Sequence, residues 1–188
     1  MRTTGADAPV RERRLVTGRL ILRRPVATDA RAIESLVSER EVARFTANIP
    51  HPYPYGAAAM WIAQLSDSAE IVWAIERRED AVLIGCIGLR LIREHRTAIP
   101  GYWIGKPFWR MGYATEALGA VLAYAFDVRR VARVDIRAMP GNGASIRVQE
   151  KHGFVPKGMG TETAPARGGS IEVELRTLSR AAWEMTRR

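Results

Sequence analysis

The sequence predicts a single α+β domain, with a mixed sheet and helices packed on its faces. Two observations support this fold class. Residues 71–105 contain three apolar segments of strand length, and residues 98–126 and 133–153 each read as a strand, a loop and a helix. The chain has 188 residues, of which 47% are apolar, so it can bury a sizeable core without a second domain.

The predicted elements follow one another along the chain. Residues 1–14 should form a flexible basic arm, with fraying to about Val16, and residues 15–188 the domain. Strands are predicted at 20–24, 71–77, 81–90, 98–105 and 133–138, with a closing hairpin at 154–159 and 171–178. Helices are predicted near 29–38 and 56–66, from Gly112 and after Asn142. The loop 164–169 should be the most flexible internal segment.

The segment 101–117 predicts an anion site. Its strand should end near Lys106, because Pro107 lacks an N–H donor, and a helix begins at Gly112. The helix buries one face, through Ala114, Leu118, Val121, Leu122, Ala125 and Phe126. N–H groups of a first helical turn have no partner within the helix, so this junction suits a diphosphate. Alternatively, Gly112 only allows close packing of helix and strand.

The glycine pattern narrows the choice of phosphate ligand. The chain has neither a Gly-rich run ending in Gly-Lys-Ser/Thr nor a Gly-x-Gly-x-x-Gly fingerprint, which disfavours a nucleoside triphosphate or a dinucleotide. A second strand–loop–helix unit follows, in which Asn142 suits an N-cap and Gly153 ends the helix. Ser145 and Gln149 lie on one face of that helix.

Together these segments resemble the GNAT (general N-acetyltransferase) superfamily, and within it the branch of ribosomal-protein-alanine N-acetyltransferases. Three further segments resemble that branch: Thr-Gly-Arg-Leu-Ile-Leu-Arg-Arg-Pro at 17–25, His-Pro-Tyr-Pro at 51–54 and Ile-Gly-Cys-Ile-Gly at 84–88. The resemblance implies a GNAT fold, with a mostly antiparallel mixed sheet of about six to seven strands and about four helices. It also implies acetyl-coenzyme A as cofactor, held by residues of both units: Trp103, Ile104, Arg110, Met111, Gly112, Tyr113, Ala114, Thr115, Asn142 and Ser145.

Two residues of the predicted diphosphate loop depart from the general pattern. Trp109 stands where the superfamily usually has Gln or Arg, a substitution that the ribosomal-protein branch commonly shows. Arg110 stands where that branch usually has Gly, which makes the loop more constrained and adds a cation beside the phosphates. Arg110 either tightens binding or points to solvent.

Acetyl transfer from a thioester to an amine needs a neutral amine, a polarised carbonyl and a proton for the departing thiolate. A backbone N–H near Ile104 could polarise the carbonyl. Many relatives supply the proton from a Tyr, but the matching residue is Gln149, so Ser145 becomes the candidate; alternatively it only supplements the helix cap. The general base is not identified by the resemblance, because Ile99 stands where relatives often carry Glu. The candidates are Glu116, His51, His95 and a water relay; alternatively Glu116, in the first turn of its helix, only complements the helix dipole.

The acceptor side should be lined by residues of the segment that covers it in relatives. The substrate-binding candidates are His51, Tyr53, Tyr55 and Trp73, with Phe45 and Trp61 beside them. Cys86 lies in an apolar strand, so it should pack rather than react, and no metal ligands are predicted.

The net charge of +9 raises nucleic-acid binding as an alternative, but no zinc spacing, helix-turn-helix or RNA-recognition signature accompanies the arginines. The polar N-terminus and the single cysteine predict a cytoplasmic protein without membrane segments. We therefore expect an N-acetyltransferase that acts on a protein N-terminus or a small-molecule amine by direct transfer. The alternative within the family is a non-catalytic coenzyme A binder, and relatives often form homodimers.

Overall fold

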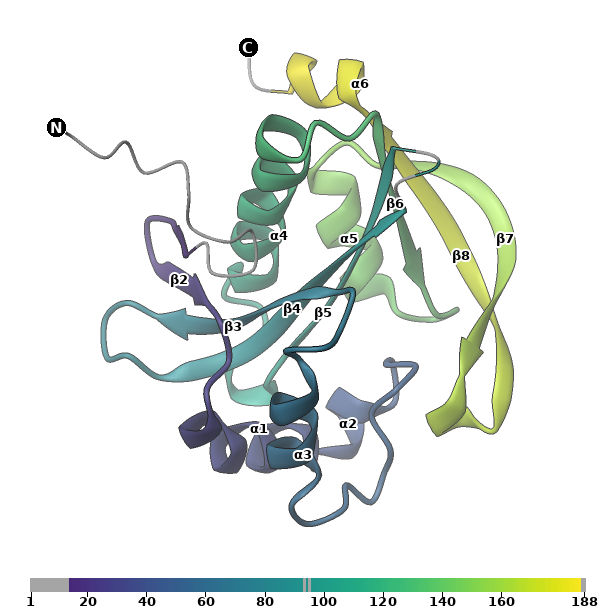
Figure 1. Ribbon diagram of the computed structural model, residues 1–188. Coiled ribbons are helices and arrows are strands. Elements are labelled where there is room, and N and C mark those ends of the chain that lie inside the picture. Colours follow the sequence, from purple (N-terminus) through teal and green to yellow (C-terminus); the bar gives the residue numbers. More distant parts are fainter. Residues whose placement is uncertain (1–13, 93, 95, 187–188) are drawn as a thin grey trace, which may run out of the picture.

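Eight strands form one sheet in the order β1-β2-β3-β4-β5-β6-β8-β7 (Figure 1). The structure is a computed structural model and describes residues 14–92, 94 and 96–186. Neighbouring strands are antiparallel except for the parallel pair β5 and β6. The strands are β1 Leu15–Val16, β2 Leu20–Arg23, β3 Ile71–Arg77, β4 Leu83–Ile92, β5 Thr97–Ile104, β6 Arg133–Ala138, β7 Val155–Ala164 and β8 Gly169–Ser179. The predicted α+β class with a mostly antiparallel mixed sheet is confirmed.

Helices cover both faces of this sheet. They are α1 Ala30–Val37, α2 Arg40–Ala43, α3 Ala57–Gln64, α4 Tyr113–Ala123, α5 Gly143–Lys151 and α6 Arg180–Met185, and the π-helical turn η5 Tyr124–Val128 extends α4. One hydrophobic cluster packs α4 on the sheet through Leu118, Leu122 and the strand residue Ile87. A second cluster packs α1 and α3 on the opposite face, through Ile33, Ala58 and Cys86. Each helix set therefore has its own half of the core, one on each side of β4 (Figure 1).

The parallel pairing of β5 with β6 is short. It covers only Thr97 with Arg133 and Ala98 with Val134, after which the two strands diverge (Figure 1). Residues of β5 face β4 and β6 alternately, and Pro100 is the next residue that faces β6. Because proline has no N–H, the next bond of this ladder cannot form. A gap therefore opens in the middle of the sheet.

Most predicted elements have the expected type, and the differences have local causes. The strand predictions at 71–77 and 133–138 are confirmed to the residue. The strand predicted from Ala81 begins at Leu83, because Ala81 has a φ of 58° and belongs to the preceding turn. Val16 lies in β1 and not in a frayed arm, while residues 1–13 of the predicted arm lie outside the described residues.

Two short helices were not predicted. The helix α2 has a single turn, too short for a periodic pattern. The helix α6 begins at Ser179, whose Oγ accepts from the N–H of Ala182, and it buries Trp183 against Phe126. One cap and one aromatic residue fix this helix, and its six residues are too few to give a clear periodic pattern.

The loop between β7 and β8 contacts the acceptor-side segment. Arg167 donates to the carbonyls of Ala43 and Ile49, and the N–H of Ala166 donates to Ala47 at 3.2 Å. The loop therefore holds residues 43–49 in place beside the gap in the sheet.

Candidate functional site

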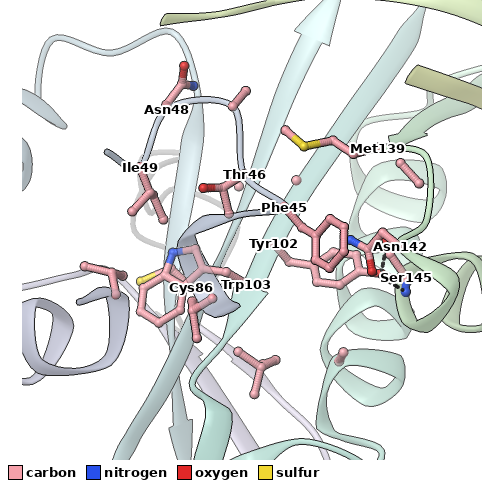
Figure 2. A pocket seen from close by; sticks show the side chains of 18 of the residues that line it. Phe45, Thr46, Asn48, Ile49, Cys86, Tyr102, Trp103, Met139, Asn142 and Ser145 are labelled. Carbon is pink, nitrogen blue, oxygen red and sulfur yellow. Dashed lines mark hydrogen bonds between the residues drawn. The ribbon is translucent and has the colours of Figure 1, made fainter. Parts of the chain in front are cut away.

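A cleft of about 1040 Å³ opens where β5 and β6 diverge. Its walls are the second half of β5, the N-terminal ends of α4 and α5, and the segment 45–50 with the helices below it. Figure 2 shows side chains from these walls around one cavity, with Tyr102 and Ser145 close together on one side and Cys86 and Trp103 on the other. The two strand–loop–helix units of the sequence therefore meet at one site.

The N-terminal end of α4 presents unpaired donors to this cleft. The chain turns into the helix through Arg110 and Gly112, which have left-handed φ values of 63° and 80°. Within the described part of the chain, the N–H groups of residues 110–115 have no hydrogen-bond acceptor. The helix dipole adds partial positive charge at the same end. Such an array of N–H groups at a helix N-terminus binds phosphate oxygens.

Arg19 holds this loop from the side, a role that the sequence did not reveal. Its Nη1 donates to the carbonyl of Met111 at 2.9 Å, and its guanidinium lies 4.7 Å from the ring centre of Tyr113. Its Nε also donates to Glu116 Oε2 at 2.7 Å. The turn before β2 is thereby fastened to the first turn of α4.

Glu116 also connects the turn before β2 to α4. Its Oε1 accepts from the hydroxyl of Thr17 at 2.6 Å and from the N–H of Arg19 at 2.8 Å. Burial raises the pKa of Glu116, but these bonds outweigh it and the pKa lies below its ordinary value. Glu116 does not line the cleft, and its carboxylate holds the loop, which agrees with a structural role for this residue.

The backbone N–H of Ile104 on β5 faces the gap. The N–H of Gly105 donates to Ile84 on β4 at 2.8 Å, so the backbone groups of Ile104 point the other way, into the gap. The carbonyl of Ile104 accepts from Trp109 Nε1 at 2.6 Å. The N–H of Ile104 therefore faces the cleft, as a carbonyl-polarising group must.

A second group of donors surrounds Ser145. The hydroxyl of Tyr102 lies 3.0 Å from Ser145 Oγ (Figure 2). Gln149 Nε2 donates to the same Oγ at 3.1 Å. Gln149 Nε2 also donates to the carbonyl of Arg137 at 3.4 Å, which fixes the orientation of the amide because a carbonyl can only accept. Asn142 caps α5 through the backbone N–H of Ser145, at 3.2 Å. The hydroxyl of Ser145 is therefore not used by the cap.

These two hydroxyls can supply a proton to the cleft. Burial raises the pKa of Tyr102 to about 12, with the Ser145 bond opposing it, so the phenol stays protonated near neutral pH. If Tyr102 and Gln149 both donate to Ser145 Oγ, the proton of Ser145 is free to point into the cleft. From the sequence, only Gln149 was expected near Ser145. The contact with Tyr102 joins residues that are 43 positions apart, so no local pattern predicts it.

The predicted cofactor residues gather in the cleft with one exception. Its walls include Trp103, Ile104, Arg110, Gly112, Tyr113, Ala114, Thr115, Asn142 and Ser145. The exception is Met111, whose side chain is exposed and whose carbonyl is taken by Arg19. His152 also supports this region, because its Nε2 lies 2.8 Å from the carbonyl of Thr115 and so links α5 to α4.

The predicted substrate residues do not all lie at the cleft. Tyr53 lines the cleft, together with Phe45 and Trp61. Trp73 does not: it is 1% exposed and packs edge-on against Tyr124 in the core, so that prediction is wrong. Tyr55 is fully exposed and lies outside the cleft. The cause is the strand period, since Trp73 and Val72 point to opposite faces of β3 and only Val72 faces the cleft.

The remaining candidates of the sequence lie elsewhere. His51 is exposed in a shallow hollow with Arg40, Arg44 and Arg167, while His95 lies outside the described residues. Cys86 is buried, and burial raises the pKa of its thiol, so it has no thiolate for nucleophilic attack. Among the described residues, no helix is long and apolar enough to cross a bilayer, and no His, Cys, Asp or Glu group could hold a metal ion.

Comparison with known proteins agrees with this geometry. Residues 19–155 match the family described as the acetyltransferase (GNAT) domain. The uncharacterized N-acetyltransferase YoaA of Bacillus subtilis is 36% identical over 149 residues, which span 77% of this chain and 84% of the relative.

Two solved structures from Vibrio cholerae share the fold. A provisionally assigned ribosomal-protein-serine acetyltransferase has 20% identity and a TM-score of 0.76, over 89% of this chain and 97% of its own. A spermidine N-acetyltransferase in complex with CoA and spermine has 21% identity and a TM-score of 0.74, over 89% of this chain and 99% of its own. At these identities the two structures show only that the fold is shared.

Proposed function

Because the chain belongs to the acetyltransferase (GNAT) family, we propose that it transfers the acetyl group of acetyl-coenzyme A to a primary amine by direct attack in a ternary complex. The observation that carries this proposal is the set of N–H groups at 110–115, which have no acceptor in the described part of the chain and open into the cleft that also holds Ser145. Diphosphate binding and proton donation are thereby combined in one cavity.

The residues of the cleft fit the cofactor. Acetyl-coenzyme A supplies an activated acetyl group as a thioester, together with a diphosphate. The N–H groups at the start of α4 would bind the diphosphate, and the left-handed Gly112 lets the backbone approach it closely. The side chain of Arg110 would add a cation beside it. The N–H of Ile104 would orient and polarise the thioester carbonyl.

The hydroxyl pair would complete the reaction. As the amine nitrogen bonds to the acetyl carbon, the carbon–sulfur bond breaks and the sulfur needs a proton. Ser145 Oγ would give its proton to the sulfur and regain one from the hydroxyl of Tyr102, 3.0 Å away. No side chain forms a bond to the acetyl group, which agrees with the protonated, buried thiol of Cys86.

Two acceptor classes fit the cleft, a protein N-terminal α-amine and a small-molecule amine. Trp109 supports the first class and the ribosomal-protein branch, in which this residue is common. The second class stays an alternative, because the same fold also serves a spermidine N-acetyltransferase. Tyr53, Phe45 and Trp61 give the acceptor side an apolar, aromatic wall that suits either.

A thiol-release assay tests the proposal. The protein is incubated with acetyl-coenzyme A and a panel of amines: peptides that begin with Ala or Ser, spermine, and an aminoglycoside. We expect at least one amine to raise free thiol well above the rate without amine, with intersecting lines when both substrates are varied. Parallel lines would contradict direct transfer.

A calorimetric titration with coenzyme A separates the alternatives. If coenzyme A binds but no amine causes thiol release from acetyl-coenzyme A, the protein is a non-catalytic binder. The presence of Gln149 where many relatives have Tyr agrees with that alternative. Absence of coenzyme A binding would remove the whole proposal. The control is Arg31→Lys, which keeps the charge of an exposed residue outside the cleft and should leave the titration unchanged.

A further inference from the structure

The cleft floor contains a hollow made by two paired glycines. Gly88 on β4 pairs with Gly101 on β5, and Val72 on β3 pairs with Gly88 from the other side. All three residues line the cleft, so they lie on the face of the sheet that carries α1 and α3. A Cβ at Gly101 would meet no atom within 4 Å, so the sheet surface is bare at this point.

Glu70 fills the hollow from the start of β3. A Cβ on Gly88 would collide with Oε1 of Glu70, so the carboxylate group lies directly over the glycine. The backbone N–H of Glu70 donates to Ser68 Oγ at 3.0 Å, which fixes the chain just before the strand. Only glycine at position 88 leaves room for the carboxylate in this place.

Glu70 differs from the other acidic side chains of the cleft. Glu41 accepts from Lys106 Nζ at 2.6 Å, and Glu162 accepts from Arg137 Nη1 at 2.8 Å. Among the described residues, no cation pairs with Glu70; Arg90, just beyond the last β3–β4 pair, is the charged group that acts on it. The carboxylate is thus both within the cleft and free to receive a ligand or a proton.

Its surroundings suit a proton acceptor. The side chain of Glu70 is exposed within the cleft, where partial loss of hydration raises its pKa above the ordinary value, with Arg90 opposing. A carboxylate with a raised pKa is a stronger base than one with the ordinary pKa. Ile99, where relatives often carry Glu, pairs with Arg90 on the same face of the sheet. Glu70, just before β3 and across β4 from β5, therefore offers the carboxylate that β5 lacks.

We propose that Glu70 is the general base of the acetyl transfer and the group that attracts the acceptor as an ammonium ion. This inference rests on the proposed function. The bound ammonium ion first loses one proton to a carboxylate oxygen of Glu70, which passes it to solvent. As the neutral amine attacks, a second nitrogen–hydrogen bond breaks and that proton also moves to Glu70, while the sulfur takes a proton from Ser145, which Tyr102 and then solvent restore. The ammonium ion and the thioester thus give the amide, the free thiol and one released proton, with no further reactant. A cationic primary amine is the acceptor class that this site selects.

The test compares Glu70→Gln, Glu70→Asp and the matched control Glu162→Gln, which removes a carboxylate of the same cleft. The probes are acetyl-coenzyme A and each amine of the panel that the wild type acetylates. We expect Glu70→Gln to lower kcat/KM by about 100-fold or more, within the range for loss of a general base, and to abolish the rise of activity with pH on the acidic side. Glu70→Asp should keep that rise, and Glu162→Gln should keep it too. Coenzyme A affinity should stay within about threefold in all three variants.

The outcomes separate the inference from the proposed function. If Glu70→Gln keeps the pH profile and more than about a third of the activity, or if Glu162→Gln is the variant that loses the profile, Glu70 is not the base. If the wild type releases no thiol with any amine, both the function and the base are overturned. Gly88→Ala gives an independent check, because the added methyl displaces the carboxylate and should reproduce the Glu70→Gln profile with coenzyme A binding intact.

Discussion

The hydroxyl of Tyr102 on β5 lies 3.0 Å from Ser145 Oγ on α5. This contact joins the strand and the helix that line opposite sides of the gap in the sheet. Gln149 donates to the same oxygen, so Ser145 is held by two partners at a point where its own proton is not used in the helix cap. Ser145 can therefore act as a proton donor that Tyr102 reprotonates.

Removing either hydroxyl should slow the reaction without weakening cofactor binding. We expect Tyr102→Phe and Ser145→Ala each to lower kcat by about 10- to 100-fold, because the thiolate loses its donor. The double variant should be little worse than the slower single variant, since both act through one hydrogen bond. Thiol release and coenzyme A calorimetry measure the two effects. Additive losses would mean that the hydroxyls act independently.

Arg110→Gly should stabilise the fold and weaken coenzyme A binding. A left-handed φ of 63° costs a non-glycine residue about 1 kcal/mol, which glycine largely avoids. The cation beside the diphosphate is lost at the same time, so we expect affinity to fall severalfold, and less so at high salt. Denaturant unfolding and calorimetry provide the two measurements.

Arg110→Asn serves as the control, because Asn tolerates the left-handed region but carries no charge. It should share the affinity loss of Arg110→Gly. If coenzyme A binds both variants as tightly as it binds the wild type, the side chain of Arg110 points to solvent.

The Arg19–Glu116 pair should affect cofactor affinity although neither residue is expected to touch the cofactor. Arg19→Ala releases the carbonyl of Met111 and the ring of Tyr113, so the α4 loop loses its support. We expect coenzyme A affinity to fall severalfold in Arg19→Ala and in Glu116→Gln, with a non-additive double variant. Arg19→Lys should not restore it, because a single ammonium cannot replace the guanidinium fork.

Kinetics distinguish this supporting role from catalysis. If Glu116→Gln removes turnover while coenzyme A affinity is unchanged, Glu116 takes part in the chemistry and the supporting role is wrong.

His152 should make the protein less stable as pH falls. Burial lowers the pKa of His152 from 6.5, and the bond to Thr115 opposes this only in part. The unfolded chain therefore binds more protons than the folded one below about pH 6.5, so the free energy of unfolding rises with pH through this range and falls as acid is added. Denaturant unfolding at several values between pH 5 and pH 8 measures the slope.

His152→Gln is the comparison, since its amide can still donate to Thr115 but does not titrate. The slope should be smaller in this variant. An equal slope in both proteins would assign the pH dependence to other groups.

The sequence could predict the elements because each depends on neighbours in the chain. The alternation of 133–138 and the cap at Asn142 with Gly153 after it are local patterns, and the structure has both. The diphosphate loop is local as well, since helix N-termini leave their N–H groups unpaired whatever lies around them. Arg110 could even be recognised as unusual, and its left-handed φ gives the reason.

The contacts between distant elements could not be predicted in the same way. Glu116 looked like a candidate for chemistry, but Arg19, 97 residues away, engages it. Trp73 looked like a substrate contact, yet one step of strand register decides which face it occupies. Tyr102 and Glu70 drew no attention because their roles depend on which strands are neighbours in the sheet, a tertiary property that a single sequence does not carry.

The early end of the β5–β6 ladder also divides the sheet into two halves, β1 to β5 and β6 to β8. The two halves are paired directly only at Thr97 with Arg133 and at Ala98 with Val134. Beyond Ala98 they are connected through the packing of α4 and α5, which includes the His152–Thr115 contact. A ligand with amide groups of its own, lying against the open edge of β5, would act as a tie between the halves. We therefore expect a ligand bound in the cleft to make the two halves of the sheet more rigid relative to each other.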